Sequence, residues 1–239
     1  MDEGEVEGII EKVEKQISEG SFEAAKKLGF WKAVGLVKKD RVLAERFGGS
    51  IGRIDKALFE SKTGAKLSYT TGTLIMLAAA VFGFALLYLG SIASGAWSAA
   101  YFLASVLILM SALHPISHII AARLFGIKFH FYFLNGPMRI EPTLKTDYET
   151  YVKASPNGRA LFHLAGALNS VAVVLLVLLI ALRAPEAPTV AKTILLALFI
   201  FTTASEIFPI VFIKLGRPKV LFADFRKSDT YRFLRELKG

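Results

Sequence analysis

The sequence predicts an all-α membrane protein with about four transmembrane helices, a small cytoplasmic β-hairpin and an N-terminal helical cytoplasmic domain. Of its 239 residues, 54% are hydrophobic, and the mean hydropathy of +0.49 is high for an ordinary soluble domain. Residues 67–122 contain no Lys, Arg, Asp or Glu. Because about 20 apolar residues cross a hydrocarbon core as a helix, this run alone predicts two spans.

The first segment, residues 1–66, predicts a cytoplasmic domain of short amphipathic helices. Four apolar side chains recur there at helical spacing and mark one face: Ile9, Ile10, Val13 and Ile17. The pair Gly48-Gly49 predicts a break between two helices, because glycine is a poor helix former. The charges of this segment nearly balance, so we expect it to lie on the membrane or dock a partner rather than to carry chemistry.

The membrane core is predicted over residues 67–213. The turn-like "SIASGA" separates the first two spans, and the prolines of "RAPEAP" separate the last two. The first span follows about 65 polar and amphipathic residues, which is not the position of a cleavable signal peptide. The predicted spans are 69–92, 97–122, 160–182 and 193–213, with a cytoplasmic hairpin segment at 123–159 and a basic cytoplasmic tail at 214–239.

The net charge of +9 predicts orientation in a membrane rather than nucleic-acid binding. Positive residues beside spans mark the cytoplasmic side and favour anionic lipid. The opposite side carries only Arg183 and Lys192. We therefore expect both termini and the 123–159 segment in the cytoplasm of a cell-membrane protein. The residues that carry this bias are Lys62, Lys66, Arg123, Lys128, Arg159, Lys214, Arg217 and Lys219.

The hairpin is predicted from an alternating pattern. Phe129, Phe131 and Phe133 alternate with other side chains at the period of two that is typical of a strand. The following "NGP" predicts a turn, and "MRIE" then pairs back. The chain has no cysteine, which excludes disulfides and thiolate chemistry.

Ionisable side chains within the spans are costly in a membrane, so each one is a candidate functional residue. At about 1.5 Å per residue, His114 lies roughly 14 Å below the cytoplasmic boundary, and Glu206 roughly 12 Å. Asn169 lies roughly 15 Å deep, and the shallower His118 and His163 roughly 8 and 6 Å. Three spans thus place polar groups in one layer.

This layer predicts a zinc site. His114 and His118 are four residues apart, so both rings lie on one helix face and can bind one metal. Glu206 is the carboxylate at matching depth, and His-His-Glu with an open position is a catalytic type of site. Asn169 and His163 are the candidate substrate-binding residues. The alternative is a helix-packing cluster of hydrogen-bonded histidines without metal.

Three stretches resemble the site-2 protease family of intramembrane zinc metalloproteases. "HPISHIIAARLFGI" resembles that family's "HELGHALAARLFGV" at His114, His118 and the run from Ala121 to Gly126. "FLNGPMRI" resembles its "GFGPKL" hairpin, and "SPNGRALFHLAGALNS" resembles "SPWKRALIALAGPLANL". The similarity covers about residues 97–182 and implies a divergent member of this family, with HPISH in place of HExxH.

The departures from the family pattern concern the chemistry. Pro115 stands where the resemblance expects the general-base glutamate, and Asn169 comes one residue early. The metal-binding aspartate expected near Pro209 is absent from its place. The later Asp224 and Asp229 are predicted to lie in cytoplasmic segments, too far out to reach His114.

The sequence is compatible with three functions. Zinc-dependent proteolysis needs a general base to accept a proton from the attacking water, and Pro115 cannot do so. The first hypothesis is therefore a proteolytically impaired membrane adaptor or regulator that binds transmembrane segments of other proteins. The second is an active zinc protease or other metal-dependent hydrolase that uses Glu206. The third is an ion- or proton-handling membrane protein.

Overall fold

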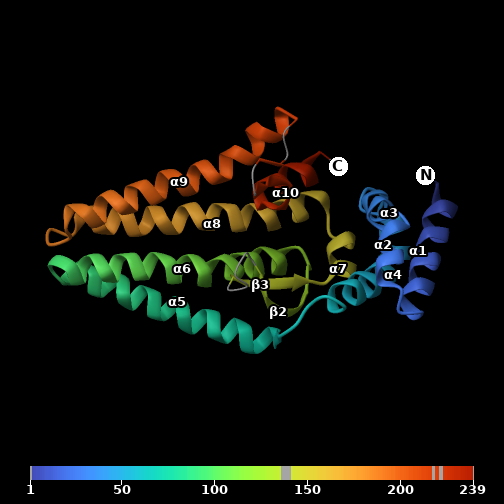
Figure 1. Ribbon diagram of the computed structural model, residues 1–239, viewed down its shortest axis with the longest axis horizontal. Coiled ribbons are helices and arrows are strands. Elements are labelled where there is room, and N and C mark those ends of the chain that lie inside the picture. Colours follow the sequence, from blue (N-terminus) through green and yellow to red (C-terminus); the bar gives the residue numbers. More distant parts are fainter. Residues whose placement is uncertain (1, 136–140, 217–218, 221–222, 239) are drawn as a thin grey trace. The chain divides into compact units, whose positions relative to one another are not determined.

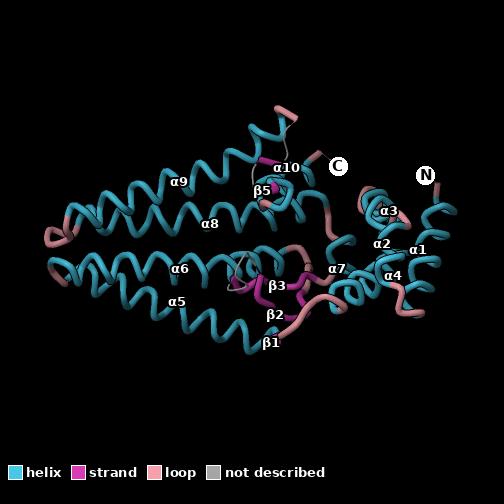
Figure 2. Tube along the Cα trace, viewed as in Figure 1, coloured by secondary structure: helices cyan, strands magenta, loops and turns pink. Residues whose placement is uncertain are grey.

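The computed structural model describes residues 2–135, 141–216, 219–220 and 223–238, which form two compact units. The first unit contains the chain up to Tyr69 together with Ala122–Arg159. The second contains Thr70–Ala121 and Ala160–Lys238. Helices make up most of both units (Figures 1 and 2).

The first unit has a helical core. The apolar faces predicted from the sequence meet there, with Val6, Ile10 and Val13 of the first helix buried against Phe30 and Ile51. Asp2 caps that helix by accepting from the Glu5 N–H, as in a capping box. The helices are α1 (Glu3–Ser18), α2 (Phe22–Lys27), α3 (Phe30–Val37), α4 (Arg41–Glu60) and α7 (Tyr148–Lys153).

The break predicted at Gly48-Gly49 is wrong, because α4 runs without interruption from Arg41 to Glu60. The reason is packing against α7. A Cβ on Gly48 would lie 2.8 Å from Lys153 Cε, and one on Gly52 would lie 2.9 Å from Glu149 Cβ. These glycines let two helices approach closely rather than ending one of them.

The predicted hairpin is part of a three-stranded antiparallel sheet. Strand β2 (Phe129–Asn135) pairs with β3 (Glu141–Thr146), and β1 (Lys66–Ser68) adds a third strand that the sequence did not predict. The "NGP" turn lies outside the described residues from Gly136 onward, as do the first three residues of "MRIE".

The second unit contains four helices that are long and apolar enough to cross a membrane, which confirms the number of spans predicted. Pro115 lies inside the second of them and Pro209 inside the fourth. Their shared core includes Phe102, Val174 and Leu195. The four helices are α5 (Tyr69–Ile92), α6 (Gly95–Leu124), α8 (Pro156–Arg183) and α9 (Thr189–Lys214).

The C-terminal segment folds back onto this bundle. The chain turns after α9 at Gly216, which has a φ of 71°. Helix α10 (Asp229–Leu237) then packs against α9 (Figure 1). Between them lie the short strands β4 (Lys219–Val220) and β5 (Ala223–Asp224) and a 3₁₀ turn at Phe225–Lys227.

Candidate metal centre

Helix α6 presents two imidazoles side by side. The ring centroids of His114 and His118 are 4.9 Å apart, and their Nε2 atoms are 3.3 Å apart. The side chain of His118 is 12% exposed and that of His114 is 31% exposed. The predicted pairing of these two histidines on one helix face is therefore present.

The carboxylate that reaches them is Asp229, the first residue of α10. Its Oδ2 lies 3.1 Å from His118 Nε2 and 3.4 Å from His114 Nε2. The expectation that Asp229 is too far out to reach His114 is wrong, because the chain reverses after α9 and returns α10 to the bundle. Ser228 caps α10, whose positive end favours the charged carboxylate.

Glu206, the predicted third ligand, is not a member of the group of converging ligand atoms. Its carboxylate accepts a hydrogen bond from Thr230 Oγ1, the residue after Asp229. Among the described residues, the group whose ligand atoms all lie within 4.8 Å of one another is His114, His118 and Asp229. The geometry therefore favours Asp229 over Glu206. The other candidate carboxylate, Asp224, pairs with Arg226 at 2.8 Å.

The far side of each imidazole ring is held by its own partner. His118 Nδ1 donates to the Phe162 carbonyl at 2.9 Å, since a carbonyl can only accept. Ser170 Oγ donates to the Gly166 carbonyl, so at 3.3 Å it accepts from His114 Nδ1. A neutral imidazole has one N–H, so both Nε2 atoms present lone pairs.

With this tautomer, the two Nε2 lone pairs face Asp229 Oδ2. An aspartate side chain ordinarily carries a negative charge near neutral pH. Three electron-rich atoms 3.1–3.4 Å apart repel one another unless a proton or a metal cation lies between them.

The spacing of the three atoms fits zinc. Zinc bonds of about 2.0–2.2 Å to imidazole and carboxylate place neighbouring tetrahedral ligands about 3.3–3.6 Å apart. The three separations of 3.1, 3.3 and 3.4 Å come close to that range without rearrangement. Histidine and carboxylate are also ligands that zinc accepts.

Gly166 of α8 gives the group its room. A Cβ at this position would lie 2.4 Å from His118 Nε2 and 2.5 Å from Asp229 Oδ2. Any other residue would place an atom directly against two of the three candidate ligands. The absence of a side chain at Gly166 therefore lets the candidate ligands lie directly against the backbone of α8.

His163 contacts Asp229, and its predicted role in substrate binding stays a prediction. Its Nδ1 lies 3.3 Å from Asp229 Oδ1, whereas His114 and His118 contact Oδ2. Its side chain is 7% exposed. A partner on the second oxygen fixes the orientation of a ligating carboxylate.

Asn169 has no assigned contact in this group. Its Nδ2 is buried and makes no hydrogen bond with the residues that the structure describes. Its predicted role in substrate binding stays a prediction.

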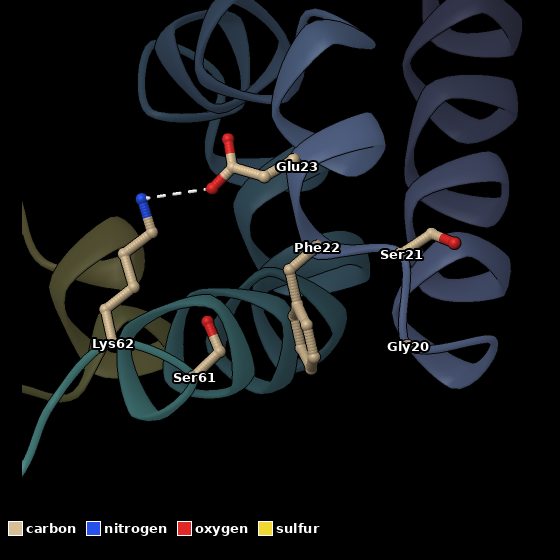
Figure 3. Close-up of a pocket in the computed structure, with 6 residues that line it drawn as sticks. All are labelled: Gly20, Ser21, Phe22, Glu23, Ser61 and Lys62. Carbon is tan, nitrogen blue, oxygen red and sulfur yellow. Dashed lines mark ion pairs between the residues drawn. The ribbon is translucent and has the colours of Figure 1, made fainter.

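A separate pocket of about 500 Å³ lies in the first unit (Figure 3). Its two charged side chains, Glu23 and Lys62, pair with each other at 3.4 Å. The residues that line the pocket are Gly20, Ser21, Phe22, Glu23, Ser61 and Lys62.

Comparison with known proteins identifies no relative of this chain. The chain matches no protein-family model, no curated protein and no solved structure. The resemblance to site-2 proteases therefore rests on the sequence motifs around His114 and His118.

Proposed function

We propose that this chain is an integral membrane protein that binds one zinc ion through His114, His118 and Asp229. The observation that supports it is the convergence of two imidazole lone pairs and an ionised carboxylate at the spacing of a tetrahedral zinc site. Three protein ligands leave a fourth position open, as in sites where zinc acts as a Lewis acid.

The further proposal is that the protein is a proteolytically impaired relative of site-2 proteases. Zinc, when bound, supplies Lewis acidity, but hydrolysis also needs a residue that accepts a proton. Pro115 lies beside His114 and has no ionisable group. Such a protein holds transmembrane segments of other proteins in the membrane, as an adaptor or regulator, without cutting them.

The proposed orientation places both termini in the cytoplasm of a cell-membrane protein. The four apolar helices support membrane insertion. Lysines and arginines are concentrated at the ends of α5, α6, α8 and α9 that connect to the first unit and to the C-terminal segment. The loop between α8 and α9 carries few of them.

One observation favours a second candidate, a metal-dependent hydrolase. With Asp229 in the third ligand position, Glu206 is not needed as a ligand, and its carboxylate is bound by the hydroxyl of the neighbouring Thr230. Glu206 is then the candidate general base. Chelator-sensitive turnover that is lost on Glu206→Gln, measured at a zinc concentration that saturates the site in both proteins, would support this candidate over the adaptor.

The test of the metal site is the zinc content of protein purified in detergent. We expect about one zinc per chain in the unmodified protein and a large loss in His118→Ala and Asp229→Asn. His130→Ala is the matched control, because His130 lies in the β2 strand of the first unit. Zinc content near zero in the unmodified protein, or equal content in all variants, would disprove the proposed site.

A further inference from the structure

Asp229 differs from the other two members of the metal group in its origin. His114 and His118 belong to a helix of membrane-spanning length, whereas Asp229 begins the nine-residue helix α10. The position of this third ligand therefore depends on how α10 is held against the bundle.

The contacts that hold the start of α10 lie on both sides of Asp229. The ring of Phe225, just before α10, stacks on Phe212 of α9 with centroids 5.3 Å apart. Thr230, just after Asp229, is 9% exposed, and its hydroxyl donates a hydrogen bond to the Glu206 carboxylate of α9. The Thr230 contact is one residue from the ligand, so it restrains the position of Asp229 more directly than the Phe225 contact does.

The Glu206 contact is also the chemically stronger of the two. A carboxylate on an apolar helix needs a polar partner, because a charge is costly there. Hydrogen bonds to charged groups are about twice as strong as neutral ones. Thr230 lies in the first turn of α10, and the positive end of a helix dipole favours a negative charge nearby.

We propose that Glu206 and Thr230 form a latch that positions Asp229 as the third metal ligand. This rests on the proposed zinc site and assigns Glu206 a role as a positioning residue. The latch and the metal then stabilise the same docked state of α10. Because such coupling is reciprocal, zinc favours docked α10 and docked α10 favours zinc.

The first test compares zinc affinity in three variants by competition with a chelator. Thr230→Val removes the hydroxyl while keeping the shape, and Glu206→Gln removes the charge while keeping an acceptor. We expect both to weaken zinc binding about 10- to 100-fold, as loss of an outer partner does at other metal sites. Thr230→Ser restores the hydroxyl, so its affinity should return to that of the unmodified protein.

The second test uses trypsin on the full chain in detergent, with and without zinc. Arg232 and Arg235 lie inside helix α10, and their side chains are exposed. Cleavage after them requires the helix to unwind locally, so its rate reports how firmly α10 is held. We expect zinc to slow this cleavage in the unmodified protein and to have no effect in Asp229→Asn. If Thr230 only stabilised the fold, Thr230→Val would speed cleavage by the same factor at all zinc concentrations.

The outcomes separate the latch from the metal site. Stoichiometric zinc binding with equal affinity in Thr230→Val and Thr230→Ser, and cleavage of α10 that ignores zinc, would overturn the latch and leave the metal site standing. Absence of zinc binding in the unmodified protein would overturn both.

Discussion

Gly166 is the residue whose substitution tests the metal site most directly. We expect Gly166→Ala to lose zinc, because its Cβ would lie within 2.5 Å of His118 Nε2 and of Asp229 Oδ2. The measurement is metal content per chain after gel filtration in detergent.

The control for crowding is Gly83→Ala on α5. A Cβ there would lie 2.8 Å from Leu109 Cδ2, so the substitution also crowds a helix contact, less closely than Gly166→Ala, and it touches an apolar side chain. We expect it to lower stability and leave the zinc content unchanged. Equal zinc content in both variants would contradict the role given to Gly166.

At the same scale, the histidines of the site were predictable and the aspartate was not. His114 and His118 follow from a local rule, since residues four apart share a helix face. Asp229 is 111 residues from His118, and its reach depends on a reversal of the chain after α9. A local signal did exist, because Ser228-Asp229 is a capped start before an amphipathic run. It predicts a helix but not where that helix docks.

At the scale of elements, an ion pair joins helix α4 to the sheet. Lys145 of β3 contacts Asp55 of α4, with side chains 9% and 7% exposed, and lies 4.6 Å from the centre of the Phe59 ring. We expect Lys145→Met to destabilise the protein by about 3–5 kcal/mol near neutral pH, because an unpaired charge is left buried. Unfolding in detergent is followed by Trp31 fluorescence in a Trp97→Phe background.

The pH dependence of this loss has a definite sign. Burial raises the pKa of Asp55, and Lys145 opposes that rise in the unmodified protein. Without Lys145, the pKa of Asp55 in the folded protein rises further. A pKa that is higher in the folded than in the unfolded state stabilises the fold at low pH. This stabilisation is lost as the pH rises through the pKa of the folded state. Lys145→Met should therefore be least harmful in acid. Lys153→Met, which breaks the more exposed pair with Glu149, is the control and should cost little at any pH.

The spans were the most predictable elements because a long uncharged run has few alternatives to a buried or membrane helix. The observed α5 and α6 begin and end within two residues of the predicted 69–92 and 97–122. The third strand, β1, is only three residues long and its pairing to β2 comes from a segment more than 60 residues away. No local periodicity specifies such a contact. The glycines of α4 failed as break signals for the same reason, since their partner is the distant α7.

At the scale of the whole molecule, the charge distribution predicts the topology. Reporter fusions at both termini should give cytoplasmic signals, because Lys and Arg concentrate beside one end of the spans. A fusion in the loop between Arg183 and Thr189 should give the opposite signal and serves as the internal control. A C-terminal reporter outside the cytoplasm would overturn the orientation.

The last prediction joins the site to the activity of the whole protein. We expect the unmodified protein, supplied with zinc in detergent or liposomes, to cleave a panel of transmembrane helical peptides no faster than His114→Ala does. The reason is the missing base, since general acid–base catalysis contributes about 10²–10⁴-fold.

Pro115→Glu places a carboxylate beside His114 and should raise chelator-sensitive cleavage above that background if α6 keeps its shape. Pro115→Gln is its matched control, with similar size and no base. Cleavage by the unmodified protein that a chelator abolishes, and that disappears in both His114→Ala and Asp229→Asn, would show an active protease. Loss of that activity in Glu206→Gln, with zinc still bound, would then identify the carboxylate next to Thr230 as the base that replaces the missing glutamate.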